Sequence, residues 1–185
     1  ANELQVFARG LLLLAEVLFP IDWTSGQPVT QDGADIANFL YLLAFDDPSQ
    51  VVTRLYENYV PHPGTLPENA TSAIAAMNVG YDQINHIGHG FRFNMSVGQS
   101  SIVNADADAL TNGDKLSNLF LLNCTAVAFT YYCIGEHFLL NPNGGAVSVL
   151  GAAESPVGAS QAFEPTQDRR GLYKLVNPAK AASAA

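Results

Sequence analysis

Positively charged side chains are scarce in this sequence. Its 185 residues include 8 Lys and Arg against 17 Asp and Glu, which gives a formal net charge of -9 at pH 7. A protein that follows a nucleic-acid backbone needs clustered cations to displace counterions from the phosphates. The composition therefore argues against nucleic acid as a partner.

Long apolar runs and cysteines are also few. The main apolar run near the start, residues 11–19, contains Glu16 and is far shorter than the ~20 residues that a membrane-spanning helix needs. We therefore expect no membrane span. The two cysteines, Cys124 and Cys133, are too few for a disulfide framework and do not match the spacing of a zinc site. Their number leaves the redox compartment undecided.

The sequence does have an ample supply of apolar residues. Hydrophobic residues make up 48% of the chain and charged residues 14%, a balance that favours a folded globular protein. We expect one core domain over residues 1–160, because domains usually have ~100–200 residues. Residues 161–185 lack a periodic apolar pattern and are predicted to be a C-terminal loop or linker. With no initiator Met and no signal peptide, the chain reads as a piece of a larger polypeptide or assembly.

Strand-like and helix-like patterns alternate along the chain. Short apolar or β-branched runs predict strands, and apolar residues at helical spacing predict helices. The predicted strands are 10–17, 51–56, 81–87, 119–122 and 146–150, and the predicted helices are 36–44, 71–78 and 135–140. This order is typical of an α/β fold with a mostly parallel sheet and helices on both faces. Residues 91–117 are interpreted as a polar excursion from it.

A histidine and a cysteine follow two of the predicted strands. His89 lies just after the strand over 81–87, and Cys124 just after the strand over 119–122. Because ligands bind at the carboxyl ends of parallel strands, we expect both side chains at one edge of the sheet. A nearby imidazole can generate the thiolate and later protonate a leaving amine. The pair therefore indicates acyl transfer.

Several strings around these residues resemble one known family. They are Ile84-Asn-His-Ile-Gly-His89-Gly90, Leu110-Thr-Asn112, the apolar strand that ends at Cys124, and Gly144-Gly-Ala-Val-Ser-Val-Leu-Gly-Ala152. Together they look like the catalytic block of the gingipain-type cysteine peptidases, relatives of caspases and legumain. The resemblance covers roughly residues 10 to 155. It implies a caspase-like fold and a hydrolase, specifically a cysteine endopeptidase.

The resemblance also implies roles for individual residues. Cys124 matches the family's nucleophile, His89 its catalytic histidine, and Glu16 a carboxylate that orients the histidine. The backbone N–H groups of Gly90 and Cys124 would form the oxyanion hole, whose donors point to where negative charge develops. One departure is Asn123, because the family more often has a small residue before the nucleophile.

Substrates, location and cofactors are implied in the same way. The family is secreted or bound at the cell surface, acts on proteins or peptides, and selects Arg or Lys, for which Asp32 and Asp35 are the candidate substrate-binding carboxylates. No metal or other cofactor is expected in catalysis, and a structural calcium ion is the one addition that the resemblance allows. Residues 104–115 resemble a calcium loop only in their first half, since they lack the Gly and Glu of an EF-hand.

Other interpretations of the same residues remain open. His86 and His89 form a His-x-x-His string, but an odd separation on a strand places two rings on opposite faces and no third zinc ligand has matching spacing. Cys133 follows two tyrosines and is interpreted as a buried structural residue. The alternative function is a catalytically silent, caspase-like binding or structural module of a larger surface assembly.

Overall fold

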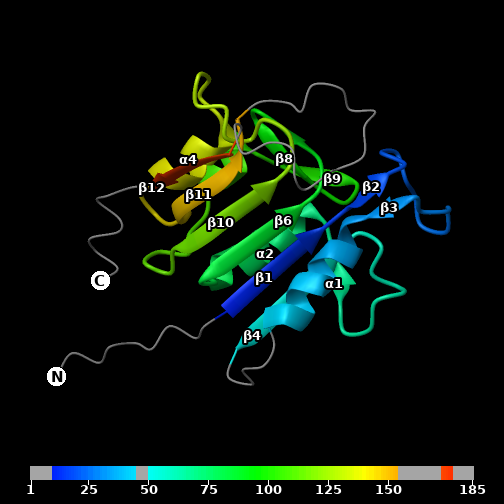
Figure 1. Ribbon diagram of the computed structural model, residues 1–185. Coiled ribbons are helices and arrows are strands. Elements are labelled where there is room, and N and C mark those ends of the chain that lie inside the picture. The colour runs from blue at the N-terminus through cyan, green and yellow to red at the C-terminus, as the bar shows by residue number, and fades with distance from the viewer. Residues whose placement is uncertain (1–9, 45–49, 154–171, 177–185) are drawn as a thin grey trace.

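A seven-stranded sheet forms the centre of the molecule (Figure 1). The computed structural model describes residues 10–44, 50–153 and 172–176. The strand order is β12-β11-β10-β6-β1-β4-β5, and every neighbouring pair is parallel except β11 with β12. The strands are β1 (Gly10–Ala15), β4 (Val51–Tyr56), β5 (Leu66–Pro67), β6 (Gln83–Ile87), β10 (Ser117–Leu122), β11 (Ala146–Ala152) and β12 (Leu172–Val176).

The continuous apolar run of β1 is explained by cores on both faces of the sheet. Leu12 and Leu14 belong to one buried cluster, whereas Leu11, Leu13 and Ala15 belong to the other. Successive side chains of a strand point to opposite faces, and a parallel strand that is covered on both sides therefore carries apolar residues at every position. The predicted central strand is confirmed.

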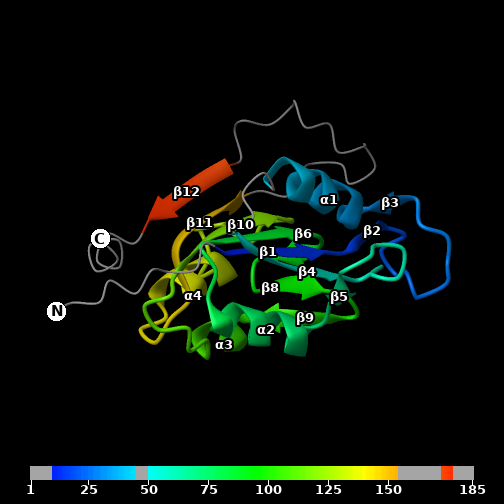
Figure 2. The ribbon, with the colours of Figure 1, turned by 90° about the horizontal axis from the view of Figure 1, so that it is seen from below.

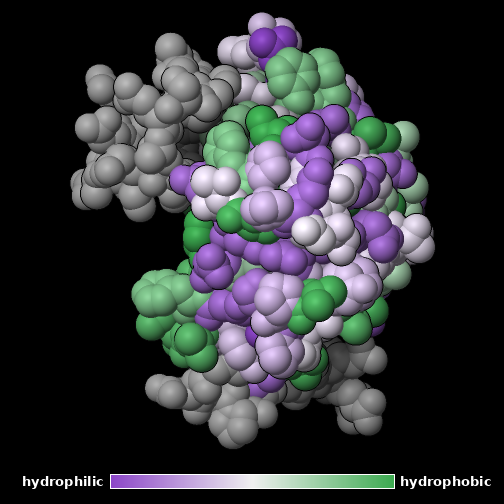
Figure 3. Space-filling model, turned by 90° about the vertical axis from the view of Figure 1, so that its right-hand side faces the viewer, coloured by the Kyte–Doolittle hydropathy of each residue, from purple (hydrophilic) through white to green (hydrophobic). Residues whose placement is uncertain are grey.

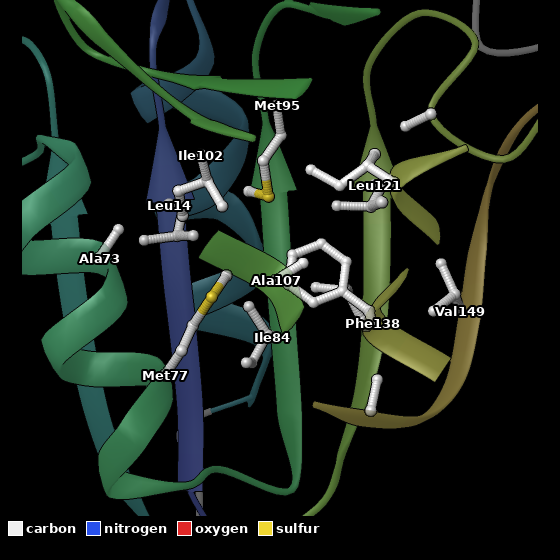
Figure 4. Close-up of a cluster of buried hydrophobic side chains, with 14 of the residues drawn as sticks. Leu14, Ala73, Met77, Ile84, Met95, Ile102, Ala107, Leu121, Phe138 and Val149 are labelled. Atoms are coloured by element: carbon white, nitrogen blue, oxygen red, sulfur yellow. The ribbon is translucent and has the colours of Figure 1, made fainter. Parts of the chain in front are cut away.

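Helices cover both faces of the sheet, as the sequence predicted (Figure 2). One face carries α1 (Gly33–Ala44), and the other carries α2 (Ala70–Val79), α3 (Asn104–Asp108) and α4 (Ile134–Leu140). In the larger core, Met77 of α2 and Phe138 of α4 point toward Ile84 and Leu121 of the sheet (Figure 4). The α/β, caspase-like arrangement of the core is thereby confirmed.

The predicted polar excursion contains a second small sheet. Its antiparallel strands are β7 (Gly90–Phe91), β8 (Asn94–Val97) and β9 (Ser100–Val103). Only Met95, Val97 and Ile102 of these strands are fully buried, and the remaining positions are largely polar. The apolar signal is therefore too sparse for the strands to be recognised in the sequence.

The structure also adds elements to the expected order, among them a hairpin after β1 and the edge strand β12. Residues just past Glu16 form the hairpin β2 (Val17–Phe19) and β3 (Gln31–Asp32), so the predicted strand ends at Ala15 rather than at residue 17. β12 pairs antiparallel with β11 in a stretch that was predicted to be loop. The other residues of the predicted 161–185 segment lie outside the described part of the chain.

Among the residues that the structure describes, none of the helices combines the length and the apolar character that crossing a bilayer requires.

Candidate active site

Three neighbouring strands deliver the sequence-predicted residues to one edge of the sheet. Glu16 follows β1, His89 follows β6 and Cys124 follows β10, and β6 lies between the other two strands. Ala15 and Leu122, the last residues of β1 and β10, are both in register with Ile87 at the end of β6. The three strands therefore end level, and the residues that follow them meet at the carboxyl edge. This side faces the viewer in Figure 3 and is mostly hydrophilic, with separate hydrophobic patches.

Glu16 is hydrogen-bonded to neighbouring segments through its main chain and to the turn that carries His89 through its side chain. The carboxyl is buried, and its Oε2 accepts a 2.6 Å hydrogen bond from the backbone N–H of His89. Its own N–H donates to Ile87 O, and its carbonyl accepts from Gly33 N. A Cβ on Gly88 would collide with the Glu16 carboxyl. Glu16 thus fixes the backbone of the turn that carries His89.

Burial raises the pKa of Glu16 to about 8, with a further rise from the charge of Glu57 and a partial offset from the His89 amide. A carboxyl taken out of water favours its neutral form. At neutral pH the side chain is therefore mostly protonated. It supports the turn as a hydrogen-bond acceptor rather than as a charge.

The ring of His89 is oriented by a main-chain carbonyl. Its Nε2 lies 3.0 Å from Leu18 O, and because a carbonyl can only accept, Nε2 carries the hydrogen in the neutral ring. The lone pair then belongs to Nδ1. The Phe19 ring meets the His89 ring edge-on at a centroid distance of 6.4 Å. The imidazole is therefore half-buried with a defined tautomer.

Cys124 stands at the start of a sharp turn. It is a free, partly exposed thiol. The next residue, Thr125, has φ of 54°, the left-handed conformation that a β-branched residue seldom adopts. Such conformations gather at functional sites. The second thiol, Cys133, is fully buried, which raises its pKa and confirms that it is shielded.

Gly90, one of the two oxyanion-hole candidates, is closely packed against Asn123. Gly90 pairs with Met95 in the small sheet, and a Cβ at Gly90 would lie 2.6 Å from Asn123 Nδ2. Main chain next to His89 therefore packs directly on the residue before Cys124. The role of the Gly90 and Cys124 N–H groups stays a prediction.

The sequence did not predict the contact between two buried polar side chains near this edge, His86 and Asn123. His86 is fully buried, with Nε2 2.7 Å from Ser96 O and Nδ1 3.3 Å from Asn123 Nδ2. Burial lowers the pKa of His86 to about 4, so the ring is neutral at physiological pH. The available signal was that each polar residue adjoins an apolar strand end, Asn123 next to Leu122 and His86 next to Ile87.

The two candidate substrate-binding carboxylates, Asp32 and Asp35, differ in their contacts and exposure. Asp32 accepts hydrogen bonds from Ala34 N at 2.9 Å and Asn58 Nδ2 at 2.8 Å, and it lies 3.8 Å from His62 Nε2. Asp35 is exposed in the first turn of α1. Both carboxylate oxygens of Asp32 thus already accept hydrogen bonds from neighbouring residues. The role of both residues in substrate binding stays a prediction.

The first part of the acidic segment that resembled a calcium loop, Asn104–Asp108, is folded as α3. Asp106 accepts from Val103 N at 2.9 Å, and Asp108 pairs with His137 Nδ1 at 2.8 Å. Within 10–44, 50–153 and 172–176, no three His, Cys, Asp or Glu side chains are grouped to hold a metal ion. Calcium binding stays a prediction.

Comparison with known proteins points to one family. The model of peptidase family C25 matches residues 20–177, whereas no curated protein gives a match. One similar solved structure is the complex of Porphyromonas gingivalis RgpB pro- and mature domains, with a TM-score of 0.54 and 21% identity, covering 80% of this chain and 33% of that one. Another is the Arg-specific cysteine proteinase gingipain R, with a TM-score of 0.55 and 21% identity, covering 79% and 32%. The chain thus spans about a third of these structures, and at this identity the likeness establishes the fold.

Proposed function

The chain belongs to peptidase family C25, and from this premise we propose that it carries the catalytic centre of a cysteine endopeptidase. The observation that carries the proposal is the level ending of β6 and β10, which lead directly into His89 and Cys124. A thiol and an imidazole at adjoining strand ends are the minimum that cysteine-dependent acyl transfer needs.

In the proposed reaction, His89 acts first as base and then as acid. Its Nδ1 takes the proton from the Cys124 thiol while Leu18 O holds the hydrogen on Nε2. The thiolate attacks the scissile carbonyl carbon, the C–N bond breaks, and the imidazolium returns the proton to the leaving amine. Water, deprotonated by His89, then attacks the thioester, which releases the carboxylic acid and regenerates the thiol.

Three further groups assist in this scheme. The N–H groups of Gly90 and Cys124 stabilise the oxyanion of each tetrahedral intermediate. Glu16 acts through the backbone of His89, to which it is hydrogen-bonded at 2.6 Å. Since its pKa lies near 8, we assign it a positioning role rather than that of an ionic partner.

The wider setting is proposed by analogy with the family. A similar solved structure is described as Arg-specific, and a protein or peptide substrate with Arg or Lys at the cleavage position is the corresponding proposal here, with Asp32 and Asp35 as the candidate carboxylates. Secretion or attachment to the cell surface is proposed on the same grounds. Because the chain spans about a third of its solved relatives, we propose that it works within a larger polypeptide.

The test is cleavage of a pool of fluorogenic peptides under reducing conditions. We expect cleavage by the wild-type chain, its loss in Cys124→Ala, and a fall of roughly 100- to 10,000-fold in His89→Ala, the range for loss of a general base. Cys133→Ala is the matched control and should retain most activity. Cleavage that survives in Cys124→Ala would contradict the assignment of Cys124 as nucleophile, whereas a wild-type chain that cleaves nothing would favour the catalytically silent module.

A further inference from the structure

A chain of hydrogen bonds connects the turn that carries Cys124 to the turn that carries His89. Asn123 Nδ2 meets His86 Nδ1 at 3.3 Å, and His86 Nε2 meets Ser96 O at 2.7 Å. Ser96 N in turn donates to His89 O at 3.0 Å. The connection therefore starts at the residue before Cys124 and ends on the main chain of His89.

The direction of each hydrogen bond is fixed by chemistry. Ser96 O can only accept, which places the hydrogen of His86 on Nε2 and leaves Nδ1 as an acceptor. Only the amide nitrogen of Asn123 can donate to that acceptor, so the side chain has one orientation. A carboxylate at position 123 would have nothing to donate. The neutral histidine is thus matched to asparagine in particular.

Steric contact reinforces the link. Asn123 is 8% exposed and His86 is 0% exposed, so water does not compete for their hydrogen bond. The Asn123 amide also occupies the space that a side chain at Gly90 would need, with 2.6 Å from Nδ2 to an added Cβ. Its bulk therefore fits a glycine on the facing turn.

We propose that Asn123 and His86 are positioning residues that hold the Cys124 thiol at its working distance from the His89 imidazole. This inference rests on the proposed peptidase function and adds two residues to it. Glu16 secures the histidine turn from the β1 side, and the Asn123–His86 pair secures it to the cysteine turn on the β10 side. Small displacements matter here, because an error of about 1 Å in the placement of reacting groups can lower the rate about 100-fold.

The variants isolate the pair. Asn123→Ala removes the amide, Asn123→Asp keeps its volume and removes the donor, and His86→Phe keeps a ring and removes both nitrogens. The Asn38–His62 pair serves as the matched control, since Asn38 Nδ2 lies 2.7 Å from His62 Nδ1 on the α1 side of the sheet. Its variants are Asn38→Ala and His62→Phe.

Two rates are measured at pH 7, at a temperature where thermal unfolding shows each variant to be folded. One is the alkylation of Cys124 by iodoacetamide, which needs no substrate, and the other is peptide turnover, resolved into kcat and KM. We expect each change in the pair to slow alkylation and lower kcat roughly 10- to 100-fold, with KM within about threefold. The double variant should be no slower than the worse single, because both act through one contact.

The control variants should alkylate Cys124 at the wild-type rate even where they unfold at lower temperature. The inference is overturned if folded Asn123→Ala and His86→Phe alkylate like wild type, or if their effects multiply. It is also overturned if wild-type Cys124 reacts no faster than in the unfolded chain. Failure of peptide cleavage alone, with the alkylation pattern intact, would count against the proposed function and not against the pair.

Discussion

At the scale of single residues, we expect a buried carboxyl that follows β5, at the carboxyl edge of the sheet, to influence how stability responds to pH. Glu68 is 6% exposed, and neither of its carboxylate oxygens has a hydrogen bond of ordinary geometry among the described residues. Burial raises its pKa well above 4.5, the neighbouring acids Glu16 and Glu57 raise it further in their ionised forms, and the Gly98 amide offsets part of the rise. The native state therefore keeps a proton on this side chain.

We expect Glu68→Gln to stabilise the protein more at pH 8 than at pH 4. The unfolded chain releases the Glu68 proton as the pH rises above about 4.5 while the native state retains it, so wild-type stability falls in that direction. Glutamine removes this titration. The measurement is the thermal midpoint at both pH values, with Asp114→Asn, an exposed acid, as a control for net charge. Equal pH responses of the two variants would contradict the assignment.

At the scale of secondary-structure elements, the sequence predicts the longer strands and helices, whose apolar residues recur at regular spacing. The strand over 51–56 is found with the predicted bounds, and the helix over 71–78 within one residue at each end. β7 to β9 were missed because they have two to four residues each with few buried side chains. Similarly, His89 and Cys124 were recognised from motifs, but the Asn123–His86 contact joins positions 37 apart through strand register, which no local pattern encodes.

The start of α2 provides a test at this scale. Asn69 Oδ1 accepts from Ser72 N at 2.9 Å, and Ser72 Oγ accepts from Asn69 N at 3.0 Å, a reciprocal cap of the helix. Asn69→Ala should lower the free energy of unfolding by about 1 kcal/mol, measured by denaturant titration, because an N–H loses its acceptor. Asn69→Ser, which keeps an acceptor, should lose much less. Identical losses would show that the cap contributes nothing.

At the scale of the whole molecule, the fold explains how distant segments reach one edge of the sheet. Glu16, His89 and Cys124 lie far apart in the sequence, yet parallel pairing brings the ends of β1, β6 and β10 level. Cores on both faces hold these strands in place. The loops at the carboxyl edge can therefore vary without loss of the fold and carry functional residues. The proposed function requires that Cys124, in one of these loops, is the reactive thiol.

Brief treatment of the folded protein with dilute iodoacetamide, followed by peptide mass mapping, tests this most directly. A thiol beside an imidazole at a partly exposed edge reacts readily, whereas a thiol buried in apolar surroundings is inert. We expect Cys124 to be alkylated first, Cys133 to react only on unfolding, and His89→Ala to slow the alkylation of Cys124 at least about tenfold. Preferential labelling of Cys133, equal slow labelling of both, or a Cys124 rate unchanged in His89→Ala would contradict this expectation.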